Sequence, residues 1–225
     1  MRSNIVHPGA NKLRYEIREI VTVAKRVALS GIPIVWENIG DPVAKGEVPP
    51  EWMKKIIKDT LKEDMSFAYS PTKGLDETRV YIARERNLEG GIQITPDDIL
   101  FFNGLGDGIS HLYRNLNPQA RILGPDPAYP THSSAEAAHA NKPHITYRLD
   151  PENEWRPDLA DMEKKIRTHK HIVGILIVNP DNPTGFVYPQ ETIRAIVALA
   201  KKYKLFLISD EIYSNLAYEG SGMRK

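Results

Sequence analysis

The chain has 225 residues, enough for one large α/β domain or for one domain plus part of another. Its 30 Lys and Arg nearly balance its 29 Asp and Glu, so charge alone recruits neither nucleic acid nor a membrane surface. Cys is absent, which excludes disulfides, thiolate metal sites and a Cys nucleophile, and we predict no metal site. No apolar stretch approaches the roughly 20 residues of a membrane span, and charged residues interrupt the start of the chain. A cytoplasmic location is therefore expected.

The N-terminal region predicts one amphipathic helix over residues 11–31, followed by a short strand over residues 34–39. A Pro-containing connector then ends at Pro49-Pro50. The change in composition there predicts a domain boundary. Residues 1–49 would form an N-terminal helix and a small-domain segment, and residues 50–225 would form the main domain.

After the connector, helix and strand patterns alternate. We expect helices over residues 51–63, 74–88, 107–116, 129–140, 158–168 and 190–204. Strands are expected over residues 99–102, 121–124, 145–149, 172–179 and 205–209. These strands are short, apolar and β-branched, which is typical of strands buried on both faces. The pattern predicts a mostly parallel sheet covered by helices, and ligands bind such sheets beyond the carboxyl ends of the strands.

The first strand-to-helix junction, residues 101–109, contains Gly104, Gly106 and Gly108. Exposed amides at a helix N-terminus favour an anion, above all a phosphate. The dinucleotide fingerprint needs a glycine where Ile109 stands, and the Walker pattern is absent. A glycine-rich turn that merely permits tight packing is an equal alternative.

The second junction, residues 124–130, places Tyr129 where the next helix begins. An aromatic side chain there can stack on a planar ring, although a tyrosine packed on the edge of its own sheet is commoner. The third junction, residues 179–185, reads NPDNPTG, and its two prolines and glycine restrict the loop so that the amide of Asn182 can point at a ligand.

At the fourth junction, Asp210 continues the buried apolar run of residues 205–209. A carboxylate in that position needs a cation or strong donors, and a protonated heteroaromatic nitrogen would serve. The alternative is that Asp210 caps the next segment. Together the four junctions offer a phosphate cradle, a stacking ring, an amide donor and a buried carboxylate, a set that complements pyridoxal 5'-phosphate.

From about Ile34 to Gly220 the chain resembles the fold-type I, class I/II, pyridoxal phosphate-dependent aminotransferases. The sharpest motifs are NPDNPTG at residues 179–185 and SDEIY at residues 209–213. The resemblance implies the three-layer α/β large domain of these transferases, with a mostly parallel sheet that is incomplete here. It also implies that the N-terminal segment belongs to the small domain.

The resemblance assigns roles to individual residues. Asp210 would pair with the pyridine nitrogen and keep it protonated, and with Tyr213 it would form the catalytic pair within this chain. Asn182 and Tyr213 would hydrogen-bond the ring hydroxyl. Tyr129 would stack on the ring.

Further positions follow from the same resemblance. Leu105 and Gly106 would supply backbone amides to the phosphate, without the serine hydroxyl that many relatives carry there. Tyr69 matches the tyrosine that reaches the phosphate of the neighbouring subunit, which implies a homodimer. Gly40 matches a glycine that borders the substrate, and we interpret Arg79 as structural.

The family's chemistry also requires a lysine that forms the Schiff base with the cofactor. Lys225 follows Asp210 too soon to match that lysine, and Arg224 lacks the motif of the arginine that binds the substrate carboxylate. We therefore expect the chain to represent the first part of a longer enzyme and to be inactive alone.

The expected function is transfer of an amino group between an amino acid and a 2-oxo acid, and the sequence favours alanine-type and related broad-range transaminases over dedicated aromatic ones. One alternative is a pyridoxal phosphate-dependent β-lyase on the same scaffold. Another is a non-catalytic regulatory module that binds the cofactor. Such a module would normally be joined to a DNA-binding segment, and the single N-terminal helix is too little for a helix-turn-helix.

Overall fold

A computed structural model of the chain describes residues 5–14 and 16–218. The chain forms two compact units, one made of Met1–Glu16 with Asn103–Lys225 and the other of Ile17–Phe102. The domain boundary expected after residue 49 stays a prediction.

The first unit is built on a five-stranded sheet of order β3-β2-β1-β4-β5. The strands are β1 (Arg121–Asp126), β2 (Ile145–Asp150), β3 (Arg156–Pro157), β4 (Ile172–Val178) and β5 (Phe206–Asp210). β1 pairs in parallel with β2 and β4, and β4 pairs in parallel with β5, whereas β3 runs antiparallel to β2. The predicted mostly parallel sheet is confirmed, with β3 as an addition.

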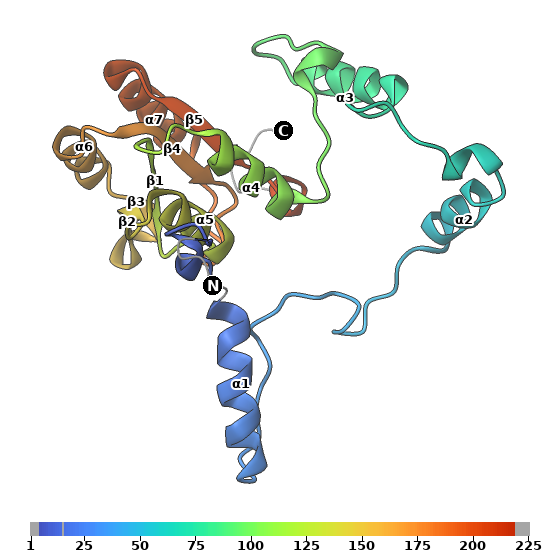
Figure 1. Cartoon of the computed structure of the whole chain (residues 1–225), viewed down its shortest axis with the longest axis horizontal. Coiled ribbons are helices and arrows are strands. Elements are labelled where there is room, and N and C mark those ends of the chain that lie inside the picture. Colours follow the sequence, from blue (N-terminus) through green and yellow to red (C-terminus); the bar gives the residue numbers. More distant parts are fainter. Residues whose placement is uncertain (1–4, 15, 219–225) are drawn as a thin grey trace. The chain divides into compact units, whose positions relative to one another are not determined.

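Helices cover both faces of this sheet (Figure 1). The helices are α4 (Leu105–Asn115), α5 (Pro130–Ala140), α6 (Leu159–Thr168) and α7 (Gln190–Tyr203). Leu123 and Ile175 pack in one cluster with residues of α6 and α7, whereas Ile122 and Leu176 pack in another with residues of α4. Neighbouring residues of a strand point to opposite faces, so the apolar runs of β1 and β4 serve both layers.

The start of the chain packs on α5. A Cβ atom on Gly9 would lie 1.8 Å from the carbonyl oxygen of Ala138, so only glycine allows this close approach. The short 3-10 helix η1 (Ala10–Lys12) follows, and Leu13 after it is extended. Because of this interruption, the helix predicted from residue 11 begins only at Glu16, as α1 (Glu16–Leu29).

The second unit contains α1, α2 (Glu51–Thr60) and α3 (Asp76–Leu88), together with the 3-10 helices η2 (Asp64–Phe67) and η3 (Pro96–Asp98). The strands predicted over residues 34–39 and 99–102 are wrong, because neither segment pairs with a strand in the described part of this unit. Apolar, β-branched residues alone do not make a strand when no partner supplies the ladder of hydrogen bonds. Within the described residues of both units, no helix is long and apolar enough to cross a membrane.

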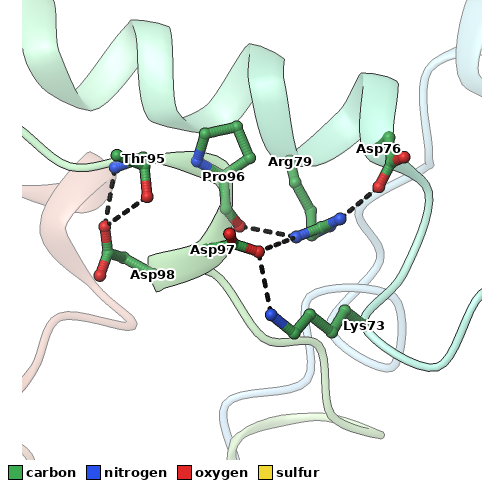
Figure 2. A network of polar contacts seen from close by, with 7 residues as sticks. All are labelled: Lys73, Asp76, Arg79, Thr95, Pro96, Asp97 and Asp98. Atoms are coloured by element: carbon green, nitrogen blue, oxygen red, sulfur yellow. Dashed lines mark hydrogen bonds and ion pairs between the residues drawn. The ribbon is translucent and has the colours of Figure 1, made fainter.

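Arg79 organises the polar contacts of α3, as Figure 2 shows. Its side chain is buried, and Nη1 donates to the carbonyl oxygen of Pro96 at 2.8 Å and lies 3.5 Å from the Asp97 carboxylate. Nη2 pairs with Asp76, and Lys73 reaches Asp97 at 2.9 Å. This network ties η3 back to α3, which agrees with the structural role expected for Arg79.

Candidate functional site

A cavity of about 210 Å³ lies at the carboxyl ends of β4 and β5. Its lining residues are Leu105, Gly106, Tyr129, Val178, Asn182, Asp210, Ile212 and Tyr213. Six of these, all but Val178 and Ile212, are residues predicted to bind the cofactor. The cavity therefore occupies the edge of the parallel sheet at which such folds bind ligands.

Asp210 is the last residue of β5 and its side chain is buried, with 4% of the residue exposed. Its Oδ2 lies 3.0 Å from Nε2 of His132, and its Oδ1 accepts a hydrogen bond from the Ile212 amide at 3.2 Å. The backbone amide of Asn179 donates to the Asp210 carbonyl at 2.9 Å. A buried carboxylate needs such donors, and these contacts fix its direction at the cavity wall.

His132 is a site residue that the sequence analysis missed. It is 2% exposed on α5, and its ring meets that of Tyr129 edge to face, with centroids 6.2 Å apart. As the donor of a hydrogen bond to the Asp210 carboxylate, Nε2 of His132 bears a hydrogen atom. The other ring nitrogen, Nδ1, is buried and has no hydrogen-bond partner among the described residues. The spacing from Tyr129 at the helix start places both side chains on one helix face, and this signal was available in the sequence.

Two further polar groups converge on the cavity from neighbouring loops. Asn182 follows β4 and Tyr213 follows β5, and Nδ2 of Asn182 donates to the Tyr213 hydroxyl at 3.5 Å. The contact is long, so both groups keep hydrogen-bonding capacity for a ligand.

The N-terminus of α4 forms the remaining part of the wall. Gly104 precedes the helix with φ at 82°, a left-handed conformation that favours glycine, and it supplies no side-chain cap. The first amides of a helix have no partners within the helix, and their dipoles attract an anion. Leu105 and Gly106 therefore present N–H groups where a phosphate is expected.

Not every predicted residue belongs to this cavity. Gly40 and Tyr69 lie in the second unit, both are exposed, and neither is a lining residue. Arg224 and Lys225 lie outside the described residues. The described lining contains no lysine. The substrate and subunit roles of Gly40 and Tyr69 stay predictions.

The donor set fits pyridoxal 5'-phosphate chemically. A buried carboxylate complements a protonated ring nitrogen, a tyrosine ring offers an aromatic face, and helix amides complement a phosphate. Asn182 and Tyr213 supply the donors and acceptors that a ring hydroxyl requires.

Comparison with known proteins gives the family. The profile of the family "Aminotransferase class I and II" matches residues 36–224. An uncharacterized aminotransferase of Methanocaldococcus jannaschii is 57% identical over 220 residues, which are 98% of this chain and 51% of that protein. The glutamate-pyruvate aminotransferase AlaA of Escherichia coli K12 is 32% identical over 208 residues, or 91% of this chain and 50% of that protein.

Solved structures agree with this result. An alanine aminotransferase from Pyrococcus furiosus superimposes with a TM-score of 0.86 at 32% identity, covering 99% of this chain and 55% of that one. A Thermus thermophilus aspartate aminotransferase gives 0.84 at 24% identity, covering 98% and 56%, which shows the shared fold. The chain spans about half the length of the curated relatives it matches.

Proposed function

Because the chain belongs to the class I and II aminotransferase family, we propose that its cavity binds pyridoxal 5'-phosphate and that the protein transfers amino groups between amino acids and 2-oxo acids. The observation that carries this proposal is the meeting of four sequence motifs in one cavity around the buried Asp210. The bound cofactor would serve as the electron sink of the reaction.

Each residue of the wall has a task in this proposal. Asp210, held by His132, pairs with the ring nitrogen and keeps it protonated. Tyr129 packs against the ring face, and Asn182 and Tyr213 hydrogen-bond the ring hydroxyl. The first-turn amides of α4 bind the phosphate.

The substrates and the assembly are also proposals. AlaA and the Pyrococcus furiosus enzyme are named for alanine, glutamate or pyruvate, so we assign this protein a small amino acid and a 2-oxo acid. In this assignment Gly40 borders the substrate, and Tyr69 reaches the phosphate site of a second copy in a homodimer. A lysine has to join the cavity for amino transfer, and the described lining does not include one.

Binding of pyridoxamine 5'-phosphate to the chain tests the site directly. This probe has no aldehyde, so it does not react with surface lysines, and its affinity is measured by calorimetry or by its own fluorescence. Asp210→Asn should weaken binding about 10- to 100-fold, because a hydrogen bond to a charged group is worth about 1.5–3 kcal/mol. Asp150→Asn, which changes a carboxylate paired with Arg148 outside the cavity lining, should leave the affinity unchanged.

Equal affinities of wild type and Asp210→Asn would contradict the cofactor site. In a protein of the relatives' full length, amino transfer from glutamate to pyruvate tests the reaction itself. Release of ammonia and pyruvate from an amino acid, without any 2-oxo acid, would assign a β-lyase instead.

A further inference from the structure

The loop that carries Asn182 is folded around a buried carboxylate. Asp181 is 3% exposed, and its Oδ2 accepts hydrogen bonds from the Thr184 hydroxyl at 2.6 Å and from the Thr184 amide at 3.2 Å. The backbone closes the same turn, since the Asp181 amide donates to the Phe186 carbonyl and the Gly185 amide donates to the Asp181 carbonyl, both at 2.9 Å. Four hydrogen bonds therefore meet at one residue.

Burying the Asp181 carboxylate costs free energy, and a simple turn can form without a buried carboxylate. Burial raises the pKa of Asp181, against the Thr184 hydrogen bonds that favour the ionised form. Its Oδ1 has no partner within the described residues. An exposed Asn or Ser would close an ordinary turn more cheaply, so the depth of Asp181 calls for a role beyond chain reversal.

Two buried tyrosines lie near Asp181 and are tied into the surrounding structure. Tyr147 and Tyr188 are fully buried, and burial, with a contribution from the Asp181 charge, raises the pKa of both hydroxyls. The Tyr147 hydroxyl donates to the Leu176 carbonyl at 3.0 Å, which ties it to β4. The Tyr188 amide donates to Oδ1 of Asn179 at 2.9 Å, so the loop is also tied at its beginning.

Asn182 is thus held from both directions. On its N-terminal side Asn179 is bound to Asp210 and Tyr188, and Asp181 is bound into the turn. On its C-terminal side Thr184 is bound back to Asp181. The Asp181 side chain is buried, whereas Asn182 lines the cavity.

We propose that Asp181 is a positioning residue, which anchors the turn through Thr184 and thereby directs the amide of Asn182 at the ring hydroxyl of the bound cofactor. The inference rests on the proposed function. Asp181 itself does not line the cavity and acts only through its neighbour.

Two substitutions at Asp181 separate positioning from general stability. In the whole chain, Asp181→Ala should weaken binding of pyridoxamine 5'-phosphate about tenfold, because Asn182 loses its direction. Asp181→Asn should stay within about threefold of wild type, because an amide oxygen still accepts from Thr184. Thr184→Val, which removes the hydroxyl but keeps the backbone amide, should fall between them.

Asp158→Ala is the matched control. Asp158 caps α6, where its Oδ1 accepts from the Asp161 amide at 2.9 Å, three residues on, as Asp181 accepts from the Thr184 amide. It does not line the cavity. This variant should lower the melting temperature and leave the affinity for pyridoxamine 5'-phosphate unchanged.

Hydrogen exchange without ligand supplies a second, independent measurement. Exchange of the Gly185, Phe186 and Tyr188 amides should rise in Asp181→Ala and stay at the wild-type rate in Asp158→Ala. Wild-type affinity in Asp181→Ala would overturn the proposal, as would unchanged exchange in that variant. If wild type itself does not bind pyridoxamine 5'-phosphate, the proposed function fails, and the positioning role of Asp181 fails with it. Faster hydrogen exchange in Asp181→Ala would then still identify Asp181 as the anchor of the turn.

Discussion

Helix α5 carries two buried polar side chains one turn apart, and their contacts differ in kind. Glu136 receives two hydrogen bonds from Arg121, with Nε to Oε1 at 2.6 Å and Nη2 to Oε2 at 3.0 Å. Arg121 also donates to the Pro143 carbonyl at 2.6 Å. His132 meets Asp210 through one contact of 3.0 Å, and its Nδ1 has no partner within the described part of the chain.

The two pairs also lie at opposite ends of the parallel strands. Arg121 is the first residue of β1, whereas Asp210 is the last residue of β5 and lines the cavity. Arg121 also borders a cavity, of about 350 Å³, but it is hydrogen-bonded to both carboxylate oxygens of Glu136, so we assign this pair to folding. A buried carboxylate that keeps a face toward a cavity has capacity left for a cationic ligand.

The largest expected effect is at the Arg121–Glu136 pair. Glu136→Ala leaves the buried Arg121 charge unpaired and should lower the free energy of unfolding by about 3–5 kcal/mol, measured by urea denaturation. Glu163→Ala, which removes a half-buried partner of the exposed Lys202, should cost far less. Similar losses in the two variants would contradict a special contribution of the buried Arg121–Glu136 pair to folding.

The free energy of unfolding should also depend on pH through His144, which lines the same cavity as Arg121. Burial lowers the pKa of His144 from 6.5 to about 4, and its Nε2 donates to the Ile122 carbonyl at 3.2 Å. The unfolded chain takes up the proton first, so this stabilisation is complete above pH 6.5 and is lost as the pH falls toward 4. The loss should reach about 3 kcal/mol.

Urea denaturation at pH 7 and at pH 4.5 measures this effect. His144→Gln keeps a donor for the Ile122 carbonyl and removes the titrating group. The variant should lose less stability than wild type on acidification. The same loss in both proteins would exclude His144 as the source.

A smaller effect is expected at the His132–Asp210 pair. His132→Leu removes the donor to Asp210 and should cost about 1.5–3 kcal/mol of stability. It should also weaken binding of pyridoxamine 5'-phosphate, which Glu136→Ala should not do in the protein that remains folded. If His132→Leu reduces stability alone, the two pairs on α5 are of one kind.

The smallest effect is expected at Tyr129. Replacing it with Leu removes an aromatic face worth about 0.5–1.5 kcal/mol, so pyridoxamine 5'-phosphate should bind about 2- to 10-fold more weakly. Tyr129→Phe keeps the ring and should bind as wild type. Equal affinity in the Leu variant would remove Tyr129 from the ring contact.

The sequence predicts the sheet of the first unit well because its strands are apolar and alternate with helices. The expected burial on both faces holds for β1 and β4, whereas most of β5 is exposed. Strands are predicted poorly from the sequence where their formation depends on a neighbouring strand. Residues 34–39 and 99–102 have strand-like composition but no strand beside them in the described structure, and β3 has only two residues, too few to show a period.

The sequence motifs predict most of the residues that line the cavity. Asn182 and Asp210 follow apolar strands and carry polar groups that a buried strand end does not need. His132 and Asp181 were not predicted because their importance comes from their burial. The partner of His132 also lies far along the chain, and the Asp181 side chain is bound to Thr184 and does not line the cavity. The spacing from Tyr129 points to the helix face of His132, but only the folded chain shows which residue that side chain contacts.

The sheet order has a practical consequence for handling the protein. β5 is the last strand of the order, and within the described residues it pairs with β4 alone. Phe206 and Leu207 on this edge are partly exposed, and an apolar open edge recruits strands from other molecules. In a preparation of these 225 residues alone, self-association can therefore start from β5. A subunit count for such a preparation becomes informative when Leu207→Lys is measured beside wild type, because a dimer that survives the added charge does not depend on that edge.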